Sequence, residues 1–89
     1  MSEPGELIGP HTEGILEQIV DDELILYNPE TESYFTLNRS AREVWELADG
    51  TMHAHEIALT LAERYGIASL ALERDVADIV ASFREADLI

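Results

Sequence analysis

The sequence predicts an α+β fold of winged-helix-like size, in which a three-stranded antiparallel sheet is followed by three helices. Between residues 14 and 37, three short runs rich in β-branched and aromatic residues are separated by turn signals. After residue 38 the apolar residues recur at steps of three and four, which is the helical period. With 89 residues, 46% of them hydrophobic, the chain has enough apolar side chains for one core and one domain.

The chain start lacks any hydrophobic period. Two prolines and two glycines fall within the first ten residues. We therefore expect residues 1–12 to form a flexible tail that can be trimmed, and residues 13–89 to form the domain.

The expected strands cover residues 14–20, 23–28 and 33–37. The acidic pair Asp21 and Asp22 marks a tight reversal between the first two strands. All three contain the β-branched or aromatic residues that suit a half-buried pleated surface. Together they predict a small antiparallel meander.

The second turn is the sequence Asn-Pro-Glu-Thr-Glu at residues 28–32. Asparagine tolerates turn geometry, and proline presets its own backbone angle and lacks a ladder donor. Because side chains alternate along a strand, Phe35 and Leu37 share one face, while Tyr34 and Thr36 share the other. We expect Phe35 and Leu37 to face the core.

The first helix is expected to begin at Asn38 or Ser40, both of which are good capping residues, and to end at Asp49 and Gly50. Its core-facing residues are Ala41, Val44, Trp45 and Ala48.

The second helix is expected over residues 54–65, with Gly66 as its stop, and the third after the capping candidate Ser69. The end of the chain, Leu88 and Ile89, is expected to fold back onto the core. The expected apolar faces are Ile57, Ala58, Leu59, Leu61 and Tyr65 on the second helix, and Leu72, Val76, Ile79, Val80 and Phe83 on the third.

Composition excludes several classes of function. Nineteen acidic residues against five basic ones give a net charge of −14, which repels nucleic acid and anionic membranes. The acids either keep the protein soluble or steer a basic peptide or enzyme surface toward it. No cysteine is present, so no disulfide, thiol nucleophile or cysteine zinc site is expected. The acidic chain start is unlike a signal peptide, and no stretch approaches the roughly 20 apolar residues of a membrane span, so we expect a cytoplasmic protein.

No constellation of catalytic residues is recognisable. His53 and His55 are two residues apart, which places them about 200° apart around a helix and favours a solvated helix start over a metal site. His11 lies in the expected tail without an evident partner. A nucleophile elbow and a glycine-rich phosphate loop are both missing. We expect a protein that is not an enzyme and that needs no metal and no cofactor.

Tyr34 has two interpretations. As a residue on the non-core face of a strand that is expected to lie at a sheet edge, it is a candidate contact for a bound peptide. Alternatively, it packs on Tyr27 or Ile25 across the hairpin as an ordinary cross-strand pair.

The string DELILYNPETESYFTLNRSAREVWELADG, residues 22–50, resembles the PqqD-like family, also called RiPP recognition elements. The shared features are an acidic strand start, a Pro-Glu-Thr turn, a Tyr-aromatic-x-Leu-Asn strand end and a Trp-x-Leu-x-Asp-Gly helix end. The resemblance runs on to the end of the chain. Two departures are His53, where the family often has Thr or Ser, and the Glu32–Ser33 turn, where it often has Gly.

This resemblance implies a fold of three strands and three helices that binds a precursor's leader peptide as an added strand. The leader is expected between the third strand and the third helix. The ending Arg84-x-Ala86-x-Leu88-Ile89 is similar to the stand-alone recognition proteins of lasso-peptide clusters. The site residues that the resemblance implies are Ser33, Tyr34, Phe35, Thr36 and Leu37 on the strand, and Asp75, Val76, Asp78, Ile79 and Ser82 on the helix.

The resemblance also implies partners. The expected partners are a precursor leader peptide and a separate modifying enzyme or leader peptidase that carries out the chemistry. The alternative is an acidic adaptor or regulatory subunit that binds a folded protein through its helices.

Overall fold

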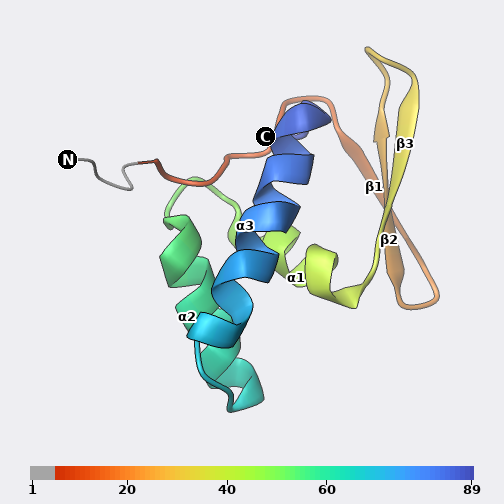
Figure 1. Ribbon diagram of the computed structural model, residues 1–89. Helices are drawn as coiled ribbons and strands as arrows, with labels where there is room; N and C mark the ends of the chain where they lie inside the picture. The colour runs from red at the N-terminus through yellow and green to blue at the C-terminus, as the bar shows by residue number, and fades with distance from the viewer. Residues whose placement is uncertain (1–5) are drawn as a thin grey trace.

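The computed structural model describes residues 6–89 and contains a three-stranded sheet followed by three helices (Figure 1). This confirms the predicted α+β fold class. The elements are β1 (Leu16–Val20), β2 (Glu23–Asn28), β3 (Ser33–Leu37), α1 (Arg39–Leu47), α2 (Ala54–Tyr65) and α3 (Leu70–Glu85).

The sheet is an antiparallel meander in the order β1-β2-β3, so within residues 6–89 one edge of β3 has no neighbouring strand. Leu26 pairs with Phe35, and Leu24 pairs with Leu37. β1 begins two residues later than predicted, because the chain is still turning at Gly14, whose φ is +88°. The β1–β2 reversal uses Asp21 at a φ of 57°, a left-handed conformation that aspartate tolerates better than most residues.

The sheet has one covered and one open face. All three helices lie on the same side of it, and α1 is the helix that contacts β2 and β3 (Figure 1). The alternation of side chains therefore buries Leu24, Leu26 and Leu37 under α1. Tyr34, on the opposite face, is 72% exposed.

Helix ends follow the local signals in the sequence. The Asn38 side chain accepts a 3.0 Å hydrogen bond from the amide of Ala41 and so caps α1. Gly66 ends α2 in the left-handed conformation, with a φ of 71°. Ser69 precedes α3 as predicted, but its hydroxyl makes no capping hydrogen bond.

His53 stands at the start of α2. The amide of His53 donates to Glu56 Oε1 at 2.8 Å, which satisfies one of the donors that the helix start leaves free. Its ring Nδ1 lies 2.9 Å from the Glu6 carbonyl. Glu56 thus caps the start of α2 through the His53 amide, while the His53 imidazole contacts Glu6.

Trp45 lies at the centre of the core, with 1% of its surface exposed. It meets Phe83 of α3 edge to face, with ring centroids 5.5 Å apart. Leu37 is buried as predicted, whereas Phe35 is half-buried and packs against the core from its edge. The prediction for α2 was wrong at Leu59 and Tyr65, which are exposed because α3 covers only one side of this helix.

The prediction of a loose tail over residues 1–12 is wrong for its described part. Ile8 is 3% exposed, and its amide and carbonyl bond to Met52 and Gly50. The amide of Thr12 donates to the Leu88 carbonyl at 2.8 Å. The segment lies as a single extended strap across the helices, and such a segment shows no hydrophobic period. Residues 1–5 lie outside the described part of the chain.

His11 also has partners, contrary to the prediction. Its ring stacks on Trp45, with centroids 3.5 Å apart, and its Nε2 lies 2.7 Å from the Trp45 carbonyl. Glu17 of β1 accepts a 3.1 Å hydrogen bond from the Trp45 indole and lies 3.9 Å from His11 Nδ1. The strap is thus held to α1 and β1 through one aromatic stack.

Candidate functional site

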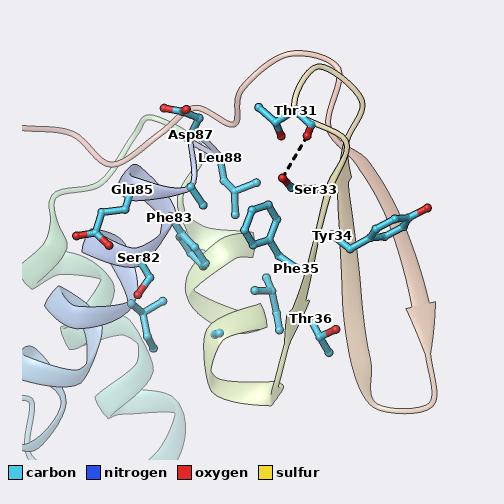
Figure 2. Close-up of a pocket in the computed structure, with 14 residues that line it drawn as sticks. Thr31, Ser33, Tyr34, Phe35, Thr36, Ser82, Phe83, Glu85, Asp87 and Leu88 are labelled. Carbon is cyan, nitrogen blue, oxygen red and sulfur yellow. Dashed lines mark hydrogen bonds between the residues drawn. The ribbon is translucent and has the colours of Figure 1, made fainter.

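A cavity of about 820 Å³ separates β3 from the second half of α3 (Figure 2). Its volume lies in the range of sites that hold small molecules or peptide side chains. Its lining residues are Thr31, Ser33, Tyr34, Phe35, Thr36, Leu37, Ala41, Ile79, Ser82, Phe83, Glu85, Ala86, Asp87 and Leu88.

The apolar floor of this cavity comes from three elements. Phe35 and Leu37 lie on the covered face of β3, and Ile79 and Phe83 recur one turn apart on α3. Leu88 joins them because the chain reverses at Asp87, which has a φ of 59°. The Leu88 amide donates to the Phe83 carbonyl at 2.9 Å, which fixes the reversal. The end of the chain therefore forms one wall of the cavity.

The polar groups around the cavity are few. The Ser33 hydroxyl donates to the Thr31 carbonyl at 3.4 Å, and the Ser82 hydroxyl donates to the Asp78 carbonyl at 3.1 Å. Glu85 and Asp87 lie on the rim, and no basic side chain lines the cavity in the described chain. The site thus combines an apolar floor, an acidic rim and the unpaired backbone edge of β3.

Tyr34 points away from this cavity (Figure 2). Its ring packs on Tyr27 across the hairpin, with centroids 4.6 Å apart and ring planes 36° apart. The cross-strand pair is therefore present. Tyr34 borders the cavity from the open face of β3, whereas the alternate residues Phe35 and Leu37 lie on the covered face.

Comparison with protein families identifies the chain. The family described as "Coenzyme PQQ synthesis protein D (PqqD)" matches residues 23–89. The chain belongs to the PqqD family. This confirms the family that residues 22–50 predicted. A comparison with curated proteins finds no match.

Two solved structures share the fold of this PqqD-family chain. TbiB1, solved in complex with the TbiA(beta) leader peptide, superposes with a TM-score of 0.75 at 23% identity, over 88% of this chain and 91% of its own. Lasso peptide synthetase B1, complexed with the leader peptide, gives a TM-score of 0.74 at 25% identity, over 89% of this chain and 93% of its own. Both extend the likeness beyond residues 23–89 to nearly the whole described chain.

The structure brings most of the ten predicted site residues of the PqqD-family chain together. All five from β3, together with Ile79 and Ser82, line the large cavity. Asp75 and Val76 instead line a second, smaller cavity among the three helices, which Ile79 also reaches. Asp78 lines neither of these two cavities.

Seven of the fourteen lining residues are not among the site residues that the sequence predicts. For Phe83 the sequence predicts a place in the core, and for Leu88 it predicts only that the end of the chain folds back. Their shared signal, the apolar end of the chain, was visible in the sequence. The other missed lining residues are Thr31, Ala41, Glu85, Ala86 and Asp87.

The structure also tests the histidine pair for a metal site. His53 and His55 stack with centroids 5.9 Å apart, and no group of three His, Asp or Glu side chains within residues 6–89 is placed to hold a metal ion. In the α1–α2 loop, the Thr51 hydroxyl and amide both donate to Asp49 and hold the pKa of its carboxyl below its ordinary value. The hydrogen bonds to the ionised Asp49 carboxylate stabilise the fold above the pKa that Asp49 has in the unfolded chain. This stabilisation is lost as the pH falls through the lowered pKa of the folded protein.

Within residues 6–89 no helix is long and apolar enough to cross a bilayer.

Proposed function

We propose that this PqqD-family chain binds the leader segment of a ribosomally synthesised precursor peptide and delivers it to a separate modifying enzyme or leader peptidase. The chain itself carries out no chemistry in this proposal. The observation that carries it is the 820 Å³ cavity, because this cavity joins an unpaired strand edge to a row of apolar side chains.

An extended peptide suits both halves of this site. The free edge of β3 offers backbone donors and acceptors that an added strand can pair with, whatever its sequence. Every second side chain of that strand then points to the apolar floor formed by Phe35, Ile79, Phe83 and Leu88. Backbone pairing thus provides affinity, and the floor selects the sequence.

The two structures of the same fold support the nature of the ligand, because both were solved with leader peptides. The likeness to lasso peptide synthetase B1 also favours a lasso-peptide pathway, in agreement with the ending Arg84-x-Ala86-x-Leu88-Ile89. Holding the leader in this way raises the local concentration of the precursor at the partner enzyme. Such a protein would act in the cytoplasm, where the precursor is made.

The test is a calorimetric titration with the leader peptide of the precursor encoded beside the gene. We expect saturable one-to-one binding that a scrambled leader lacks. Ser82→Trp places a large ring at the exposed mouth of the cavity and should weaken binding about tenfold or more, the loss that follows from about 1.4 kcal/mol.

The matched control is Ala71→Trp, which adds the same ring to an exposed α3 position outside both cavities. It should leave binding unchanged. A folded wild-type protein, as judged by circular dichroism, that binds none of its neighbouring leaders would contradict the proposal and favour the adaptor alternative.

A further inference from the structure

A second cavity of about 50 Å³ lies among the three helices. Its walls are partly apolar, but it also carries two carboxylates and two hydroxyls. The residues that matter here are Ser40 and Glu43 of α1, Tyr65 of α2, and Asp75, Val76 and Ile79 of α3.

Glu43 is an unusual residue in this cavity. Only 13% of its side chain is exposed, and Oε1 is shielded from solvent without a hydrogen-bond partner in the described chain. Its other oxygen lies 3.9 Å from Nε of Arg39, whose side chain is 81% exposed, so this ion pair is long and screened by water. Arg42, the next cation, bonds to Glu46 at 3.2 Å instead. A shielded carboxylate oxygen without a partner is costly and calls for an explanation.

This small cavity adjoins the leader groove. Ile79 lines both cavities, and Ser40 of the small one directly precedes Ala41 of the large one. Ser40 follows Leu37 by three residues, so the α1 side of the small cavity lies toward the Leu37 end of β3. A long side chain from a peptide along β3 would have to pass Ile79 to reach Glu43.

We propose that the small cavity binds the side chain of a lysine or arginine in the leader peptide. The proposal rests on the leader-binding function proposed above. The aliphatic stem of either residue packs on apolar walls such as Ile79, while the cation meets Glu43 and Asp75. A volume of about 50 Å³ exceeds the roughly 10–15 Å³ that a water needs, which leaves room for a cationic head group.

The orientation of the leader sets where this cation falls in its sequence. An antiparallel strand has its N-terminal part opposite the Leu37 end of β3, so its cation precedes the residues that pack on Phe35. A parallel strand would reverse that order.

The test compares leader binding by the full-length protein and by the variants Glu43→Gln, Asp75→Asn and Glu63→Gln, with calorimetry as the readout. Glu63→Gln is the matched control, because it makes the same change at an exposed α2 residue that lines neither cavity. Glu43→Gln should weaken binding about tenfold, as expected for the loss of a charge-assisted hydrogen bond, and Asp75→Asn should weaken it less. Glu63→Gln should change affinity by less than about twofold.

A scan of the leader, with each Lys or Arg replaced in turn by Gln, completes a double-mutant cycle. One leader replacement should weaken binding to the wild-type protein about as much as Glu43→Gln weakens binding of the unchanged leader. The same replacement should weaken binding to Glu43→Gln little further. If every leader replacement has the same effect on both proteins, the proposal is wrong. A wild-type protein that binds no leader would instead overturn the leader-binding function itself.

Thermal unfolding of the free protein separates this role from a purely structural one. Glu43→Gln should leave the melting temperature unchanged or raise it, because it removes a buried charge that lacks a full partner. A fall in melting temperature that Arg39→Gln reproduces, together with unchanged leader affinity, would show that Glu43 serves the fold and not the leader.

Discussion

Trp45 shows how a single residue ties this protein together. Its ring stacks on His11 and meets Phe83 edge to face, and its indole N–H donates to Glu17. One side chain therefore joins α1 to α3, to the strap and to β1. It is also the sole tryptophan of the chain, so its fluorescence reports on this junction.

Replacing His11 tests the stack. His11→Ala should destabilise the protein by about 1 kcal/mol, because it removes an aromatic pair of the kind that contributes about 0.5–1.5 kcal/mol. Urea unfolding followed by Trp45 fluorescence measures the change. His11→Phe retains the ring and should recover part of the loss, whereas equal stability of all three proteins would show that the stack contributes nothing.

Replacing Tyr34 tests its position on the open face of the sheet. An added leader strand would place one of its own side chains beside Tyr34 on that face, outside the apolar groove. Tyr34→Ala should therefore weaken leader binding by no more than about fivefold, the equivalent of a cross-strand pair of about 1 kcal/mol. Calorimetric titration of the leader into Tyr34→Ala and into Ser82→Trp compares the two losses of affinity. A larger loss for Tyr34→Ala than for Ser82→Trp would mean that the leader lies on the open face instead.

Among the elements, the strap formed by residues 6–12 has the most unexpected role. It pairs with the loop before α2 through Ile8 and with the end of the chain through Thr12. Glu6 adds a 2.8 Å ion pair to Arg84 of α3. Because Leu88 is both a strap partner and a wall of the groove, the strap supports the binding site from behind.

Two neighbouring residues of the strap provide a matched pair of variants. Ile8 is 3% exposed and Leu7 is 48% exposed. Ile8→Ala should cost about 2–4 kcal/mol of stability, the usual range for truncating a buried aliphatic side chain, while Leu7→Ala should cost less than about 1 kcal/mol. Chemical denaturation measures both, and similar small losses would show that the strap is loosely held.

At the scale of the whole molecule, charge is the dominant property. Residues 13–38, which include the entire sheet, contain seven acidic residues and no lysine or arginine. Among the described residues, three of the five arginines are already engaged with Glu43, Glu46 and Glu6. The field around the groove is therefore negative and favours a cationic ligand over an anionic one.

Salt should weaken leader binding for this reason. Raising the ionic strength from about 0.1 M to about 1 M shortens the screening length from about 10 Å to about 3 Å. We expect the affinity for the leader to fall over this range in calorimetric titrations. A leader whose lysines and arginines are replaced by glutamine should show a flatter response, and a salt-independent wild-type affinity would argue against charge attraction.

The sequence alone determined the elements and their local boundaries. Asn38 caps α1, Gly66 stops α2, and the alternation at Phe35 and Leu37 marks the covered face of β3, because each depends on neighbours along the chain. The motif between residues 22 and 50 was specific enough to predict the family. From these features the position of the groove between the third strand and the third helix could also be predicted.

Only the tertiary structure decided what those elements enclose. Ile8 and His11 pack on residues more than thirty positions away in the sequence, so local hydrophobic periodicity cannot predict their burial. The packing of α1 against α3 likewise decides two features of the cavities. Ile79 lines both of them, and Oε1 of Glu43 is shielded from solvent. Local sequence specifies which residues can face inward, but burial and solvent exclusion are properties of the assembled surfaces.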